Sequence, residues 1–164
     1  MKKILAIAVA VLTIGIAGAQ QVRSPYKTVG AALPSLRIVD RSMQPHTEAE
    51  INKKNHSFVV MFNPTCHHCI DVAKMFGTHK KDFRKNTIFF VAAADMMPYM
   101  DHFYKETGAA EFDNITIGVD SSSIITNLYK YGNLPQINIY DKNKKLVRIF
   151  SGETPLDSLL QYAN

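Results

Sequence analysis

The composition of this 164-residue chain excludes several function classes. Nineteen Lys and Arg stand against 14 Asp and Glu, for a formal net charge of +5, and the basic residues are scattered over predicted turns and helix ends. A nucleic-acid surface needs a stripe of basic residues with stacking aromatics. The sequence has none, so we expect no nucleic-acid partner. The length suits one domain with its own core and is too short for two.

The first 19 residues have the pattern of an export signal. Met1-Lys2-Lys3 is basic, residues 4–16 are apolar, and Ala17-Gly18-Ala19 has the small residues of a cleavage site. The alternative is a membrane anchor, but the apolar run is shorter than the roughly 20 residues that a spanning helix needs. We expect cleavage after Ala19, a single domain at residues 20–164, export to the bacterial periplasm, and no stable membrane insertion after signal removal.

Short predicted elements open the remaining chain. Residues 20–33 are polar and predict an irregular entry segment, and residues 36–40 alternate weakly, which predicts a short strand. Thr47 followed three residues later by Glu50 is a capping box, which predicts a helix running to about Lys54. Residues 58–62 form a continuous apolar run, which predicts a buried central strand.

The second half of the chain continues the alternation of strands and helices. Apolar residues recur at helical spacing from Ile70 to Phe76, and Gly77 is a predicted end or kink of that helix. The later predicted elements are a strand at 87–94, a helix at 98–107, a strand at 114–119, a helix from Asp120-Ser121 to Tyr131, strands at 136–140 and 145–150, and a helix from Thr154-Pro155 to Ala163.

The order of these elements predicts an α/β fold. Alternating strands and helices favour a central mixed sheet with a parallel core and helices on both faces. The polar turn at 141–144 is short, so the last two strands are expected to form an antiparallel hairpin.

The only two cysteines form the motif Cys66-His67-His68-Cys69, directly after the predicted strand 58–62. A C-x-x-C motif at a strand end and helix start is typical of a redox-active dithiol, because the helix N-terminus stabilises a thiolate. Cys66 is then the nucleophile, and Cys69, one turn on, resolves a mixed disulfide. A structural bridge is the alternative, but closing so short a loop stabilises a protein weakly.

The two histidines within the motif are candidates for tuning it. A protonated imidazole near Cys66 stabilises the thiolate and therefore makes the disulfide more oxidising. We expect His68 to contribute more than His67. The alternative is that one or both rings point into solvent.

A metal site and a peroxidase loop are two alternatives to the dithiol. Two thiols and two imidazoles on one helical turn cannot converge on one ion, and the other histidines are isolated in sequence, so we expect no metal site. A metal carrier remains the alternative of a different class. Pro64-Thr65-Cys66 has a superficial likeness to a peroxiredoxin loop, but its spacing is wrong for one.

Taken together, these motifs resemble the thioredoxin superfamily, and within it the exported TlpA/ResA-like thiol-disulfide oxidoreductases. The resemblance covers most of residues 20–164. Its parts are a lead-in at 29–36, the strand and active-site turn at 58–69, a helix-strand insertion at 98–119, a strand-initial Leu134-Pro135, and a closing hairpin at 141–150 followed by Gly152. The resemblance implies a thioredoxin-like fold with an N-terminal extension.

The resemblance also implies functional roles. Pro135 would be a cis-proline beside the dithiol, and the backbone of Leu134 would pair with an extended substrate segment; an edge-strand proline is the alternative. No cofactor is implied beyond the redox-active disulfide Cys66–Cys69. The implied partners are protein thiols or disulfides and a membrane electron donor or acceptor. The direction of exchange stays open, since the histidines favour oxidation or isomerisation and the TlpA/ResA likeness favours reduction.

Three positions depart from the pattern of the superfamily. Thr65 stands where an aromatic residue commonly precedes the first cysteine, and the dipeptide between the cysteines is His-His. Val60 stands where many members have a buried carboxylate that exchanges protons with the second cysteine. The last departure raises a second hypothesis, a module that binds without turnover.

Overall fold

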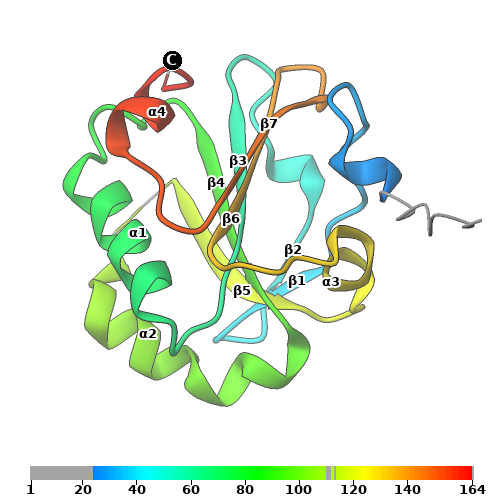
Figure 1. The fold of residues 1–164 in the computed structure, drawn as a ribbon. Helices are drawn as coiled ribbons and strands as arrows, with labels where there is room; N and C mark the ends of the chain where they lie inside the picture. The colour runs from blue at the N-terminus through cyan, green and yellow to red at the C-terminus, as the bar shows by residue number, and fades with distance from the viewer. Residues whose placement is uncertain (1–23, 110–111, 113, 164) are drawn as a thin grey trace, which may run out of the picture.

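The computed structural model describes residues 24–109, 112 and 114–163. Their centre is a seven-stranded sheet with the order β2-β1-β5-β4-β3-β6-β7 (Figure 1). Its strands are β1 (Ile38–Asp40), β2 (Pro45–His46), β3 (Ser57–Met61), β4 (Thr87–Ala92), β5 (Ile115–Asp120), β6 (Gln136–Tyr140) and β7 (Leu146–Ser151).

The sheet is mixed, as predicted. Strand β4 is parallel to both β3 and β5, whereas β6 runs antiparallel to β3 and forms the expected hairpin with β7. The N-terminal β1 runs antiparallel to β5 and pairs with β2 at the edge. The sequence did not predict β2, a two-residue strand that begins with Pro45 and has no hydrophobic alternation to reveal it.

Helices cover both faces of the sheet (Figure 1). Those with α-helical geometry are α1 (His67–Thr78), α2 (Met100–Thr107), α3 (Ile124–Tyr129) and α4 (Leu156–Leu160). Three short 3-10 helices, η1 (Pro25–Lys27), η2 (Glu48–Glu50) and η3 (Ala94–Tyr99), complete the described elements. Side chains of α1, α2 and α4 pack on one face, and those of α3 and the N-terminal extension pack on the other.

The packing of β3 explains the continuous apolar run in the sequence of this central strand. Phe58 and Val60 face the core beneath α1, while Val59 and Met61 face the core beneath α3. All four side chains are fully buried. A strand covered on both faces has no solvent side on which polar residues are favoured.

The predicted helix from Thr47 to Lys54 is wrong in length. Its capping box forms, with the Thr47 hydroxyl accepting from the Ala49 amide and the Glu50 carboxylate accepting from the Thr47 amide. The helix nevertheless ends after the single turn η2, because Ile51 takes an extended conformation that buries it in the second core.

Three later helices also differ from the prediction at their ends. The 98–107 helix is preceded by η3, so Pro98 lies in a 3-10 turn and α2 begins at Met100. Helix α3 begins four residues after Asp120 and ends at Tyr129, because the backbone of the C-cap residue Lys130 is left-handed (φ 41°). Helix α4 ends at Leu160.

The predicted export signal and its cleavage after Ala19 lie outside the described residues, so they stay predictions. Across the described residues, every helix falls short of the length and hydropathy needed to cross a bilayer.

Candidate active site

Cys66 lies where the central strand passes into helix α1. It is the N-cap residue of α1, with extended backbone angles (φ −81°, ψ 119°), and its side chain is partly exposed. Its carbonyl oxygen accepts hydrogen bonds from the amides of Cys69 (3.0 Å) and Ile70 (3.1 Å). The first turn of α1 is therefore built on Cys66, and the remaining amides of that turn lie at the helix start, beside this residue.

Cys69 occupies a different environment one turn later. Both cysteines are free thiols, and the Cys69 side chain is fully buried. Burial raises the pKa of Cys69, and the hydrogen bond between the Cys69 and Cys66 side chains raises it further. A backbone hydrogen bond with Asn63 acts in the opposite sense. The two sulfurs are therefore paired, one accessible and one protected.

Asn63 organises the loop before Cys66, and the sequence analysis missed it. Its side-chain oxygen accepts from both the amide and the hydroxyl of Thr65 (2.9 Å each), and its carbonyl accepts from the Cys66 amide (3.0 Å). The signal was present in the dipeptide Asn63-Pro64, since Asn before Pro favours the start of a turn. Asn63 is a positioning residue that fixes Cys66 against the sheet.

The two histidines between the cysteines both lie on the exposed surface. The Nε2 atom of His67 lies 3.4 Å from a carboxylate oxygen of Asp71, and the His67 side chain is 84% exposed. The rings of His67 and His68 have centroids 6.2 Å apart. The expectation that His68 matters more than His67 stays a prediction, with the His67–Asp71 pair as the structural difference between them.

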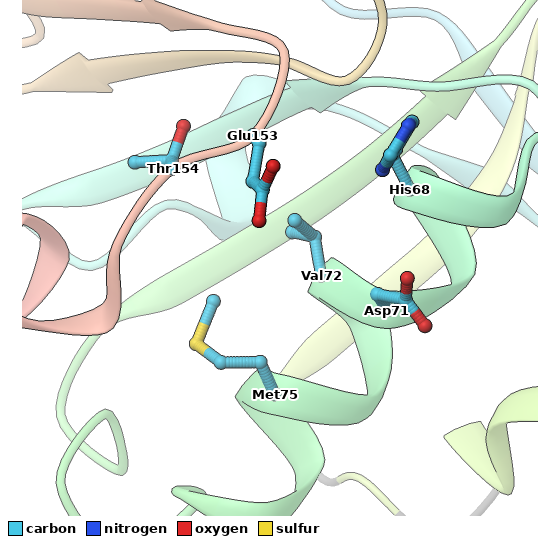
Figure 2. A pocket seen from close by; sticks show the side chains of 6 residues that line it. All are labelled: His68, Asp71, Val72, Met75, Glu153 and Thr154. Atoms are coloured by element: carbon cyan, nitrogen blue, oxygen red, sulfur yellow. The ribbon is translucent and has the colours of Figure 1, made fainter.

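A pocket of about 170 Å³ adjoins the dithiol on the side of His68. Figure 2 shows Glu153 and Thr154, on the loop before α4, facing Val72 and Met75 of α1, with His68 at one end. Its floor is apolar, because Val72 is buried and Met75 packs on the core. Its rim carries the carboxylates of Glu153 and Asp71 together with the His68 imidazole.

The Leu134–Pro135 peptide bond is cis, as the resemblance implied. In the pairing of β3 with β6, Gln136 lies opposite Met61, so Pro135 lies beside the start of the loop that leads to Cys66. Pro135 is buried, and its carbonyl accepts from the Gly152 amide (2.8 Å). Leu134 and Cys66 pack against the same core, and the ladders of β6 begin only at Gln136.

The core beside Cys69 holds Val60 in place of a carboxylate. Val60 is fully buried in the same apolar cluster as Cys69. Among the residues that the structure describes, the one buried carboxylate is Asp120, and its Oδ2 atom accepts from the amides of Ile125 (2.7 Å) and Thr126 (3.2 Å). That side chain caps α3 and belongs to the other face of the sheet, so proton exchange at Cys69 has no buried carboxylate to use.

A bound metal ion needs several ligand side chains that converge on one point. Within residues 24–109, 112 and 114–163, no three side chains of His, Cys, Asp and Glu gather as the ligands of one ion would.

Comparisons with known proteins rest on structure. No family model matches the chain, and no curated protein matches its sequence. A secreted Mycobacterium tuberculosis disulfide oxidoreductase homologous to E. coli DsbE is similar in fold, with a TM-score of 0.63 and 15% identity over 77% of this chain and 92% of that chain.

Two further solved structures are similar to the same extent. Mycobacterium tuberculosis DsbF, solved in mixed oxidised and reduced forms, has a TM-score of 0.64 and 15% identity, covering 87% of this chain and 96% of that chain. The thioredoxin domain of a Bacteroides vulgatus thiol-disulfide oxidoreductase also has a TM-score of 0.64 and 15% identity, and the match covers 84% of this chain and 99% of that chain. At such identity the likeness establishes the fold, which is thioredoxin-like, as the resemblance implied.

Proposed function

We propose that this protein is an exported thiol-disulfide oxidoreductase that exchanges disulfides with protein substrates through Cys66 and Cys69. The observation that carries the proposal is the pair itself: a partly exposed Cys66 at the N-cap of α1 and a buried Cys69 one turn later. An accessible thiol at a helix N-terminus suits attack, and a protected neighbour suits resolution. Two of the similar structures are a disulfide oxidoreductase and the thioredoxin domain of a thiol-disulfide oxidoreductase.

The reaction follows from the two positions. In the reducing direction, the Cys66 thiolate attacks one sulfur of a substrate disulfide, the substrate S–S bond breaks, and the other substrate sulfur leaves as a thiolate that takes up a proton. The Cys69 thiolate then attacks the Cys66 sulfur, forms the Cys66–Cys69 disulfide and releases the second substrate thiol. Two electrons pass to the substrate. The oxidising direction is the same sequence reversed.

The substrate segment would lie along Leu134. The hydrogen-bonded ladders of β6 with β3 and β7 begin at Gln136, so the backbone of Leu134 lies just before them and next to the Cys66 loop. An extended segment there can add main-chain hydrogen bonds, as in strand addition. A membrane electron donor or acceptor would restore the dithiol or disulfide in the periplasm.

The test uses reduction of insulin disulfides by the protein with a reductant in excess. The wild type is expected to accelerate insulin precipitation, and Cys66→Ser to remove the acceleration. Cys69→Ser should accumulate mixed disulfides with substrate proteins, whereas Cys66→Ser should accumulate almost none. Equal trapping by the two variants would contradict the assigned roles.

A module that binds metal or partner thiols without turnover is the second candidate. The observation that favours it is the apolar core on which Cys69 packs, with Val60 in the position where the resemblance implies a carboxylate. Zn²⁺ and Cu⁺ titrations of the reduced protein separate the two. Tight one-to-one binding without insulin reduction would support the module, and turnover in the presence of a chelator would support the enzyme.

A further inference from the structure

Three loops at one end of the sheet gather exposed basic residues that are separate in the sequence. The loop before β3, the loop from α1 to β4 and the turn from β6 to β7 lie together where α1 ends, and the dithiol lies where α1 begins (Figure 1). We name these residues the basic end: Lys53, Lys54, Lys80, Lys81, Arg84, Lys85, Lys142 and Lys145.

Contacts between the loops make the basic end one continuous surface. The side-chain amides of Asn52 and Asn55 both donate to the carbonyl of Lys85, at 3.3 and 2.9 Å. A surface pocket is lined by Lys54 from the first loop and by Lys142 from the β6–β7 turn. The three loops therefore present their charges to the same side of the molecule.

The basic end has a net positive charge, because its three loops hold these eight basic residues against two carboxylates, Asp82 and Asp141. All eight side chains are exposed. Within residues 24–109, 112 and 114–163, Arg41 is the one lysine or arginine that forms an ion pair. The acidic residues in the same loops have local partners: Asp82 lies 3.2 Å from His79, and Asp141 accepts from two amides of its own turn.

We propose that the basic end adsorbs the protein to an anionic lipid surface, with the dithiol facing away from the bilayer. Seven of the eight basic residues are lysines, which act as point charges without the bidentate geometry of arginine. Several such charges on flexible side chains suit a broad, flat anionic surface. A site built for one acidic protein favours arginine. Residues 1–19 predict passage across a membrane, which brings the protein to such a surface.

The chemistry of the same loops limits the mode of binding. The large exposed apolar side chains in the described residues are Val29, Met43, Tyr99 and Ile124, and none of them belongs to these loops. There is accordingly no apolar anchor for insertion and no exposed aromatic on which nucleic-acid bases would stack. The attraction is electrostatic and decays over the Debye length, ~30 Å at 0.01 M salt and ~3 Å at 1 M.

The experiment measures the fraction of the full protein, purified from the cells that produce it, that sediments with lipid vesicles. One set of vesicles is phosphatidylcholine, and the other contains phosphatidylglycerol in phosphatidylcholine. A basic-end variant replaces four lysines by Gln, and a control variant removes the same total charge elsewhere. The basic-end variant carries Lys53→Gln, Lys54→Gln, Lys80→Gln and Lys81→Gln. The control carries Arg37→Gln, Lys74→Gln, Lys105→Gln and Lys130→Gln.

The expected result is binding to phosphatidylglycerol vesicles in low salt, its loss at about 1 M salt, and no binding to phosphatidylcholine. The partition coefficient of the basic-end variant for phosphatidylglycerol vesicles should be at least about tenfold lower than that of the wild type. The partition coefficient of the control variant should stay within about twofold of the wild type. The pair Lys142→Gln and Lys145→Gln should give an intermediate loss. Thiol alkylation in all variants checks that each has kept its fold.

Three outcomes would overturn the proposal. They are equal losses in the two four-residue variants, equal binding to both kinds of vesicle, and absence of binding to phosphatidylglycerol in low salt. The last would leave an acidic protein as the partner of the basic end. The readout needs no redox turnover, so it stands or falls separately from the proposed oxidoreductase activity.

Discussion

At the scale of single residues, the two cysteines lie one helical turn apart in unlike environments. Cys66 is partly exposed at the N-cap, and Cys69 is buried with a raised pKa. Val60 supplies only apolar contact where a carboxylate would assist proton exchange. The rate of attack by Cys66 and the rate of resolution by Cys69 are therefore expected to depend differently on pH.

The rate at which Cys69 resolves a mixed disulfide at Cys66 should keep rising with pH, well above the pH range in which an ordinary thiol titrates. The step needs the Cys69 thiolate, and burial raises the pKa of Cys69, so the thiolate fraction rises about tenfold per pH unit below that pKa. The measurement follows release of glutathione from a mixed disulfide at Cys66, by rapid mixing at a series of pH values. A plateau near pH 8.5, the reference value for a thiol, would contradict the prediction.

Replacing His68 should make the disulfide less oxidising. If the protonated ring stabilises the Cys66 thiolate, His68→Ala destabilises the reduced form and lowers the reduction potential by roughly 30 mV, equivalent to about 1.4 kcal/mol. His67→Ala is the matched control and should change less, because its ring faces the Asp71 carboxylate. Glutathione redox titrations of the three proteins measure the shift. An unchanged potential in His68→Ala would remove the bias towards an oxidase.

At the scale of elements, the starts of the helices rely on different devices. Helix α1 begins at Cys66 with no side-chain cap, which leaves its first amides for the thiolate. Helix α3 is capped from the preceding strand by Asp120, the last residue of β5, because the Asp120 carboxylate reaches the amides of Ile125 and Thr126. The start of α1 is thus not capped by a side chain, whereas the start of α3 is capped by the Asp120 carboxylate.

Asp120→Ala should lower the free energy of unfolding by about 1–3 kcal/mol, since it leaves buried amides without acceptors. Asp120→Asn keeps one acceptor oxygen and should lose less. Urea denaturation of the two variants and the wild type measures the difference. The order in which Cys66 and Cys69 are alkylated should not change, because the cap lies on the other face of the sheet. Equal stability of Asp120→Ala and wild type would show that solvent satisfies those amides.

At the scale of the whole molecule, the sequence predicted the elements whose pattern is local. The buried run 58–62, the helix after Cys69 and the closing hairpin were all confirmed. Tertiary contacts decided the rest: Ile51 ends η2 by entering the core, and β2 exists only through its pairing with β1. The motif revealed Cys66 and Cys69, but the grouping of eight basic residues at one end depends on three loops meeting in space.

The attachment of the N-terminal extension to the core depends on a close approach at Gly118. In β5, Gly118 lies opposite Asp40 of β1, and a Cβ added there would lie 2.4 Å from the Val39 carbonyl oxygen and 2.6 Å from an Ile38 methyl. Strand β1 must move to accept a methyl group, and its own residue Ile38 is fully buried and has little room to move.

Gly118→Ala should therefore lower the free energy of unfolding by about 1–3 kcal/mol, the usual cost of overpacking. Gly132→Ala is the matched control, because a Cβ at Gly132 meets nothing within 4 Å, and it should change stability little. Thermal and urea unfolding of both variants measure the effect. Amide hydrogen exchange should show the loss of protection in β1 and β2 first, with β3 and β4 still protected. A uniform loss over all strands would mean that the extension and the core unfold as one unit, and that the contact at Gly118 supports the whole sheet.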